Sequence, residues 1–273
     1  INRPGTDCFE ERNGGEFYRV LDLQKYFVSE SEIKDGKIRI TGEDAHHMKN
    51  VLRMRPGEKF LAACGDEWEY TCKVLSYSED GADAAVIDAQ KPGKELPSRI
   101  FLFQCLPKGD KMEMIIQKAV ELGAAEIIPV SSARCVVKLD AKKAEAKVRR
   151  WNAISESAAK QAKRMVIPPV RPVMTFREVL EMAEQELKGA LLLIPYENAR
   201  DMDATRRILS SAEPGRPAAL LIGPEGGFDE AEVSAAERSG FMPITLGKRI
   251  LRTETAGMAA LSILMYLLEE RKE

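Results

Sequence analysis

The sequence predicts a small antiparallel β-barrel domain followed by a larger α/β domain with a mainly parallel sheet. With 273 residues, the chain has room for two domains of roughly 150 residues or fewer. Short segments of alternating hydrophobicity extend to about residue 90, whereas apolar strand-like runs alternate with helical patterns from Arg99 onward. A stretch rich in proline and glycine separates the two patterns, which places the domain boundary there.

The composition is that of a globular protein, with 44% hydrophobic and 31% charged residues. No apolar run reaches the roughly 20 residues that a membrane-spanning helix needs, and no segment resembles a secretory signal. We therefore expect a soluble protein of the cytoplasm with no membrane partner.

The first domain is expected at residues 25–90. In the segment 68–74, every second residue is apolar (Trp68, Tyr70, Cys72 and Val74), so one strand face should be buried. Residues 1–24 begin without methionine and show no clear period, and we expect a flexible extension, natural or left over from cloning, without function. Residues 91–98 should form the linker, since two prolines and a glycine oppose both helix and sheet.

The second domain is expected at residues 99–273. Its predicted strands are 99–105, 126–131, 189–194, 217–222 and 241–246. Three intervening helices have starts that match or resemble a capping box: Asp110 with Glu113, Thr175 with Glu178, and Asp229 with Glu232. The helix near 111–122 should bury Ile115, Ile116, Ala119 and Leu122 and end at Gly123.

Neither a disulfide framework nor a metal site is indicated. The five cysteines are never spaced as CxxC, so we expect reduced, mostly buried thiols. The chain has two histidines, His46 and His47, and neighbouring residues of a strand point to opposite faces. We therefore predict no bound metal.

Basic residues are concentrated in two segments although the net charge is only −2. Residues 46–59 carry four basic side chains against one acidic side chain, and residues 142–164 carry eight against two. A solvated surface explains either segment alone, but two of them in a near-neutral chain favour a polyanionic partner. The basic residues of interest are Lys49, Arg53, Arg55, Lys142, Lys143, Lys147, Arg149 and Arg150.

Three unusual segments follow predicted strands of the second domain: 195–197 (PYE), 223–228 (GPEGGF) and 246–256 (LGKRILRTETA). Ligands of open α/β sheets bind beyond the carboxyl ends of strands, so these segments are candidates for a binding site. A glycine-rich turn alone is often only a turn, and the sequence contains neither the dinucleotide nor the P-loop motif. If these segments bind a cofactor, they do so through a loop that is neither of these two motifs.

Five blocks within about residues 25–270 resemble one family, the SPOUT methyltransferases, and within it the ribosomal RNA small subunit methyltransferase E group. The blocks are HHMKNVLRMRPGE, LPKGDKMEMIIQKAVELGAAEIIPV, ESAAKQAKRMVIPPV, IGPEGGFDEAEV and LGKRILRTETAGMAAL. The resemblance implies a PUA-like barrel for RNA, a carboxyl-terminal domain with a deep trefoil knot, a homodimer, and methylation of a 16S ribosomal RNA uridine at N3.

The resemblance also implies S-adenosyl-L-methionine as the cofactor, held in the knot loops. A side chain at position 226 is then expected to enter the cofactor's space, unless that glycine serves only the turn. The expected cofactor-binding residues are Ile194, Pro195, Tyr196, Gly223, Pro224, Glu225, Gly226, Gly227, Leu246, Gly247, Ile250, Leu251 and Thr253.

Methylation at N3 requires a uridine that loses its N3 proton, so a cation should stabilise the developing negative charge. Arg252 is the first candidate and Arg164 the second. Glu254 could orient an arginine or accept the proton, although its place in the first turn of the last helix also suits a structural carboxylate. The eight basic residues named above are expected to contact RNA phosphates.

The last helix carries small residues that suit close packing in a homodimer, and ordinary burial within the chain is the alternative. The residues concerned are Ala256, Gly257, Ala259, Ala260, Leu261, Leu264, Met265 and Leu268. Two other functions compete with the methyltransferase: a non-catalytic RNA-binding or ribosome-assembly protein, and a metabolic enzyme with an unusual phosphate loop. The intact glycines at 223, 226, 227 and 247 argue against the first, and the two basic segments argue against the second.

Overall fold

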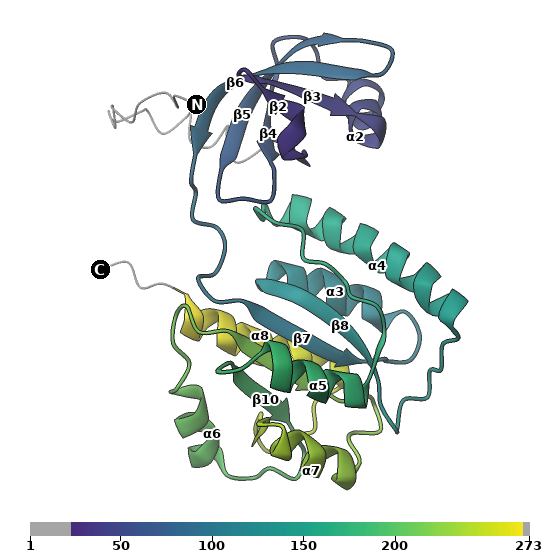
Figure 1. Ribbon diagram of the computed structural model, residues 1–273, viewed down its shortest axis with the longest axis vertical. Coiled ribbons are helices and arrows are strands. Elements are labelled where there is room, and N and C mark those ends of the chain that lie inside the picture. The colour runs from purple at the N-terminus through teal and green to yellow at the C-terminus, as the bar shows by residue number, and fades with distance from the viewer. Residues whose placement is uncertain (1–22, 270–273) are drawn as a thin grey trace. The chain divides into compact units, whose positions relative to one another are not determined.

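The computed structural model describes residues 23–269, which form two compact units (Figure 1). The chain divides between Pro92 and Gly93, inside the expected linker 91–98. The expected extension lies outside the described residues up to position 22. Gln24 already belongs to the first unit, because its carbonyl oxygen accepts a hydrogen bond from the Leu61 amide at 2.8 Å.

The first unit is built on a curled six-stranded sheet in the order β1-β4-β5-β6-β3-β2 (Figure 1). The strands are β1 (Lys25–Phe27), β2 (Ile33–Lys34), β3 (Lys37–Thr41), β4 (Lys59–Ala63), β5 (Glu69–Tyr77) and β6 (Gly81–Gln90). All neighbours are antiparallel except β1 and β4, so the expectation of a wholly antiparallel sheet is wrong at this edge. The chain between β1 and β4 is long enough to return in the same direction, as a parallel pair requires.

The core of the first unit contains Cys72 and Val74, and Tyr70 packs against it half-buried, as the alternation in this segment predicts. The first unit also holds an unpredicted ion pair, in which the Lys25 ammonium lies 2.5 Å from the Glu69 carboxylate with both side chains almost wholly buried. Neither residue type signals burial by itself, because isolated charges are expelled from apolar cores.

The two histidines lie in helical turns, α2 (Gly42–His46) and η2 (His47–Val51), so the expected strand at this place is wrong. Nδ1 of His47 lies 3.1 Å from the hydroxyl of Tyr26, within hydrogen-bonding distance. Within residues 23–269, no group of three His, Cys, Asp or Glu side chains could hold a metal ion. Cys72, Cys105 and Cys135 are buried and free, and Cys64 is half-buried and free.

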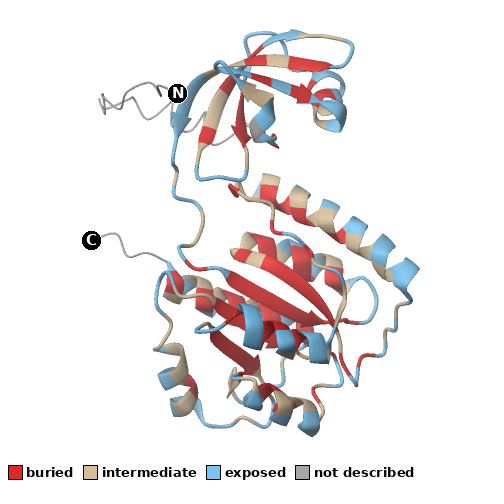
Figure 2. Ribbon diagram, in the orientation of Figure 1, coloured by how far each residue is buried: buried red, intermediate tan, exposed pale blue. Residues whose placement is uncertain are grey.

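The second unit contains an all-parallel sheet in the order β12-β10-β11-β7-β8-β9. The strands are β7 (Ile100–Cys105), β8 (Ala124–Ser131), β9 (Met174–Thr175), β10 (Leu191–Pro195), β11 (Ala218–Ile222) and β12 (Met242–Ile244). The five predicted strands are confirmed within a few residues, and β9 was missed because two residues carry no periodic signal. Figure 2 shows these strands as the most buried layer of the unit.

Helices cover both faces of this sheet (Figure 1). They are α3 (Lys111–Glu121), α4 (Ala141–Gln161), α5 (Phe176–Glu186), α6 (Met202–Leu209), α7 (Glu230–Arg238) and α8 (Thr253–Leu268). On one side α3 contacts α4, α8 and β8, and on the other side α5 contacts α7 and β8. In the part of the chain that the structure describes, no helix is long and apolar enough to span a membrane.

Helix α3 buries Ile115, Ile116 and Ala119 as predicted, while Leu122 at its end is only half-buried. Gly123 ends the helix with φ at +87°, a conformation that glycine adopts without strain. An added Cβ there would lie 2.6 Å from Leu96, so this turn also needs glycine for space.

Two of the three expected capping boxes are confirmed. The side chains of Thr175 and Asp229 cap α5 and α7, each with the reciprocal glutamate bond. The box at Asp110 is wrong, because its side chain makes no capping hydrogen bond. Its expected partner Glu113 instead binds the Arg150 guanidinium at 2.9 Å, so the ion pair between α3 and α4 takes the carboxylate away from the helix end.

Candidate functional site

A pocket of about 580 Å³ opens beyond the carboxyl ends of β10, β11 and β12. These strands and β7 are neighbours in a parallel sheet, so the segments that follow them meet at one edge. All three segments predicted from the sequence line the pocket. The predicted cofactor residues in its lining are Pro195, Tyr196, Gly223, Pro224, Glu225, Gly226, Gly227, Leu246, Gly247, Ile250, Leu251 and Thr253. Ile194 does not line it, because its side chain is fully buried in β10.

The first two loops approach each other at Gly227. Its φ is +66°, and a Cβ at this position would lie 2.8 Å from Oε1 of Glu197. A side chain there would therefore meet both backbone strain and a carboxylate. The close approach brings residues 195–197 against residues 223–228 at one wall of the pocket.

The space beside Gly226 is limited by the loop that follows β8. A Cβ at this position would lie 3.3 Å from Cβ of Arg134, and the Arg134 guanidinium donates to the Gly226 carbonyl at 3.1 Å. The expectation that a side chain here enters the cofactor's space stays a prediction, and the structure adds that its first atom would face Arg134. The missing side chain is directed at the neighbouring loop after β8, so position 226 controls how tightly two loops pack.

The third loop reaches the pocket through a tight turn at Gly247, whose φ is +107°. The Thr245 hydroxyl accepts a hydrogen bond from the Gly247 amide at 3.3 Å and holds the turn. Beyond the turn, Ile250 is 90% exposed and Leu251 is half-buried. The loop thus offers apolar side chains and glycine backbone to a ligand, as an adenine-containing cofactor requires.

Lys111, the first residue of α3, lines the pocket and was missed by the sequence analysis. Its ammonium lies 3.0 Å from Oε1 of Glu225 and 3.3 Å from Oε2 of Glu254. The hydrogen bond to Glu225 is the main cause that raises the pKa of Lys111, against the opposing effect of burial. The available signal in the sequence was its place at the start of a predicted helix, directly after a predicted strand.

Glu225 also accepts a hydrogen bond from the Lys108 amide at 3.0 Å. Burial opposes its ionisation, but backbone amides and the Lys111 ammonium together outweigh that effect and lower the pKa of Glu225. The carboxylate therefore fastens the loop after β11 to the start of α3.

The structure brings two of the three expected catalytic residues to the pocket region. Arg252 lines the pocket and is exposed, and within residues 23–269 its guanidinium has no hydrogen bond or ion pair. Glu254 does not line the pocket, but its side chain, 12% exposed, pairs with Lys111, which does. Lys248 and Arg249 line the pocket as well, so it carries four basic side chains, of which Lys111 is held in ion pairs.

Arg164 lies elsewhere, contrary to the expectation that it takes part in the chemistry. Its guanidinium donates to the Glu95 carboxylate and, from Nη1, to the carbonyl oxygens of Val120 at 2.7 Å and Ala124 at 3.1 Å. Only 6% of the residue is exposed. Arg164 connects the end of α4 to the segment before β7 and to the end of α3, and it does not line the pocket.

The basic residues of α4 lie mostly on its exposed surface. Lys142 is exposed, and Lys143, Arg149 and Arg150 are exposed but form ion pairs with acidic neighbours. Such surface pairs are weak, so they leave the cations accessible to phosphate. The ammonium of Lys147 lies 5.9 Å from the ring centroid of the buried Trp151.

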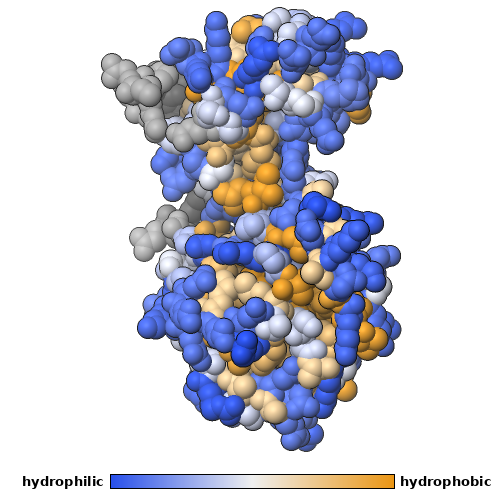
Figure 3. Space-filling model, turned by 45° about the vertical axis from the view of Figure 1, so that its right-hand side comes forward, coloured by the Kyte–Doolittle hydropathy of each residue, from blue (hydrophilic) through white to orange (hydrophobic). Residues whose placement is uncertain are grey.

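The three basic residues of the first unit that were expected to contact RNA are also exposed. Lys49 lies in η2 with its ammonium 5.9 Å from the ring centroid of Tyr77, and Arg53 and Arg55 follow that turn. Figure 3 shows hydrophilic side chains over much of the visible surface of both units. Each unit therefore presents its own group of solvated cations.

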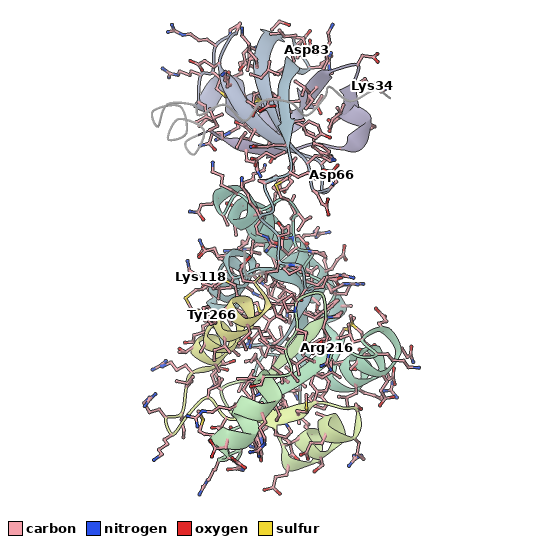
Figure 4. The ribbon with its side chains drawn as sticks, turned by 90° about the vertical axis from the view of Figure 1, so that its left-hand side faces the viewer. Lys34, Asp66, Asp83, Lys118, Arg216 and Tyr266 are labelled. Atoms are coloured by element: carbon pink, nitrogen blue, oxygen red, sulfur yellow. The ribbon has the colours of Figure 1, made fainter. Side chains whose placement is uncertain are left out.

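The final helix α8 separates the residues expected in a dimer interface into two sets. Gly257, Ala260, Leu261, Leu264 and Leu268 are buried within the unit, so burial inside the chain explains these five. Ala256, Ala259 and Met265 are half-buried. The outward face carries other apolar residues, Ile263 and the 79%-exposed Tyr266, and Figure 4 shows Tyr266 on the same side of the unit as Lys118.

Comparisons with family models define the class of protein to which the chain belongs. A family model described as an RNA methyltransferase domain matches residues 94–265, and one described as an RNA methyltransferase PUA domain matches residues 40–87. The two matches fall on the two units of the structure. Together they define an RNA methyltransferase with a PUA domain.

Individual similar proteins define the family more narrowly. The chain is 38% identical to the ribosomal RNA small subunit methyltransferase E of Bacillus subtilis over 90% of this chain and 98% of the relative. A crystal structure of the Neisseria gonorrhoeae protein of that name, bound to S-adenosyl methionine, is 33% identical with a TM-score of 0.78, covering 90% and 98% of the two chains. A Legionella pneumophila methyltransferase structure in complex with the same cofactor is 31% identical with a TM-score of 0.77, covering 89% and 97%. The chain therefore belongs to the ribosomal RNA small subunit methyltransferase E family.

Proposed function

We propose that the protein transfers the methyl group of S-adenosyl-L-methionine to the ring N3 of a uridine in 16S ribosomal RNA of the small subunit, in the cytoplasm. The observation that carries the proposal is the convergence of three loops, far apart in sequence, on one pocket. Two similar structures, those from Neisseria gonorrhoeae and Legionella pneumophila, hold this cofactor. The family membership supports the RNA substrate.

The pocket suits a cofactor of this kind. Its volume of about 580 Å³ lies in the range of small-molecule sites, and Gly227 and Gly247 add no side chain at two points of its wall. Leu246, Ile250 and Leu251 supply apolar surface for adenine. When bound, the cofactor supplies an electrophilic methyl group on a positively charged sulfur.

The chain's own residues then have to stabilise the uridine while it loses the N3 proton. As the proton passes to water, the electron pair left on N3 forms the new bond to the methyl carbon, and the bond from that carbon to sulfur breaks. Arg252 stabilises the negative charge on the ring, because its free guanidinium lines the pocket. Glu254 takes the structural role that the sequence left open, since it holds the Lys111 ammonium at the pocket wall.

RNA binding is proposed for both groups of exposed cations. Lys49, Arg53 and Arg55 of the PUA-like unit, and Lys142, Lys143, Lys147, Arg149 and Arg150 of α4, contact phosphates and position the substrate. Base recognition is left to the pocket and its surroundings, because phosphate contacts carry no sequence information.

A homodimer and a trefoil knot in the second unit complete the proposal, and both rest on the resemblance. The outward face of α8 supports the dimer, since an exposed tyrosine beside an exposed isoleucine is typical of an interface. Light scattering should give a dimeric mass for the wild type and a monomeric mass for Tyr266→Glu. A monomeric wild type at micromolar concentration contradicts the dimer.

The decisive experiment offers the protein labelled S-adenosyl-L-methionine and small-subunit particles that lack the modification. Mass spectrometry of the digested RNA should place one labelled methyl group on N3 of a uridine. Label on another atom or another nucleotide corrects the substrate. RNA binding without cofactor binding and without any transfer supports the competing function, a non-catalytic RNA-binding or assembly protein.

A further inference from the structure

A buried amide side chain lies in the middle of the parallel sheet. Gln104 belongs to β7, whose six residues are all buried, and β7 pairs with β11 on one side and β8 on the other. The exposed fraction of Gln104 is 0%. Because burying an amide in an apolar core is unfavourable unless its polar atoms are paired, this residue needs an explanation.

The amide nitrogen of Gln104 begins a chain of hydrogen bonds that leads to the second and third of the three pocket loops. Nε2 donates to the backbone oxygen of Cys105 at 3.0 Å and to the hydroxyl of Thr253 at 2.9 Å. That hydroxyl donates in turn to the carbonyl oxygen of Gly223 at 2.6 Å. Thr253 ends the third pocket loop, and Gly223 begins the second.

The oxygen of the same amide is left without a partner. Among the described residues, Oε1 of Gln104 receives no hydrogen bond. It lies 3.4 Å from the point where a Cβ of Gly257 would be, so α8 packs directly on it one turn after its start. A buried unpaired acceptor destabilises a fold, and an apolar side chain of the same shape would avoid that cost. Packing alone therefore does not account for glutamine at this position.

We infer that Gln104 is a positioning residue for the cofactor pocket, which acts through Thr253 and sets the spacing between the second and third loops. The inference rests on the proposed cofactor site. The Thr253 hydroxyl is fixed as a donor toward Gly223, because Gln104 occupies its acceptor side. This fixes the start of the loop 223–228 against the residue that directly follows Arg252.

The position of Arg252 depends on the same contact. Arg252 is the N-cap residue of α8 and Thr253 is the first residue of the helix. When the Thr253 side chain loses its two partners, the end of the third loop is released from the sheet. Both the affinity for the cofactor and the placement of the guanidinium should then suffer.

The test uses full-length variants that remove the hydrogen bonds and keep the shapes. Gln104→Met and Thr253→Val should each raise the dissociation constant for S-adenosyl-L-methionine about tenfold in calorimetry. A tenfold change corresponds to about the free energy of one hydrogen bond that holds the loops in place. The melting temperature of Gln104→Met should stay equal to that of the wild type or rise, whereas Thr253→Val should lower it, because the Gly223 carbonyl and one amide hydrogen of Gln104 lose their partner. Thr253→Ser keeps the hydroxyl and should bind the cofactor more tightly than Thr253→Val, because only the hydrogen bonds distinguish the inference from a loss of bulk.

The double variant tests whether the two side chains act through one another. Gln104→Met combined with Thr253→Val should bind no more weakly than either single variant, whereas independent effects would multiply to about a hundredfold. Gln117→Met, on the exposed side of α3, is the matched control and should change neither quantity.

Three outcomes overturn the inference. Unchanged affinity in both single variants removes Gln104 from the site, and additive losses in the double variant break the connection through Thr253. A fall in melting temperature that accompanies weaker binding in Gln104→Met assigns the residue to the stability of the core. A wild-type protein that does not bind S-adenosyl-L-methionine is distinguishable from all of these, because it overturns the proposed cofactor site together with the inference.

Discussion

The end of α4 and the loop before α8 each present an arginine in a family-like block, and the structure gives the two arginines opposite surroundings. Arg164 is 6% exposed and bound to Glu95 and two backbone carbonyls. Arg252 is exposed at the pocket and has no partner among residues 23–269. The difference teaches that an arginine whose hydrogen bonds are already satisfied holds a fold together, while an unsatisfied one is available to a ligand.

The largest effect on stability is expected at Arg164. Arg164→Ala leaves the Glu95 carboxylate and two carbonyl oxygens without their donor, so the free energy of unfolding should fall by about 3 kcal/mol. Urea denaturation measures the loss. Arg177→Ala is the control, because that side chain is 84% exposed and should change stability by less than about 0.5 kcal/mol. Equal free energies of unfolding of the two variants would contradict the structural role of Arg164.

The largest effect on turnover is expected at Arg252. Arg252→Ala should lower the rate of methyl transfer about 100-fold, because one donor for the developing negative charge is lost. Its free energy of unfolding should stay within about 0.5 kcal/mol of the wild type, since the side chain is exposed and unpaired. Single-turnover assays with cofactor binding measured separately check this. Full turnover would remove Arg252 from the chemistry.

A smaller effect is expected from the exposed cations of α4, the helix that precedes Arg164. Replacing Lys142, Lys143 and Arg149 by alanine should reduce the slope of log affinity against log salt by about 2, since each lost phosphate contact contributes roughly 0.7 for single-stranded RNA. Filter binding at several salt concentrations measures the slope. The control variant replaces the exposed Arg177, Lys188 and Arg238, and its slope should equal that of the wild type.

The smallest effect is expected at Glu225, a paired residue at the pocket wall. The pKa of its carboxyl is lowered from the ordinary value of 4.5 in the folded protein, so its ion pair stabilises the fold above about pH 4.5. That contribution is lost as the pH falls through the lowered pKa. Glu225→Gln should thus be less stable than the wild type at pH 7 by about 0.5 kcal/mol, and the difference should shrink when the pH is lowered to about 3. A constant difference at both pH values would contradict the role of the charge.

The sequence alone determined much of the fold, because hydrophobic periodicity is a local property. Five of the six strands of the second unit and the helix starts at Thr175 and Asp229 follow from neighbouring residues. The three pocket loops could also be predicted, since a parallel sheet brings the ends of its strands to one edge.

Only the tertiary structure decided which polar side chains meet across the fold. The parallel pairing of β1 with β4, the burial of Arg164 beside Glu95, and the hydrogen bonds from Gln104 through Thr253 to Gly223 join residues far apart in the chain. In the sequence, Arg164 and Arg252 are two arginines that no local pattern distinguishes. Charge and hydrogen-bonding capacity are properties of a residue, but burial and partners are properties of the packed chain, and these determine whether an arginine supports the fold or faces a substrate.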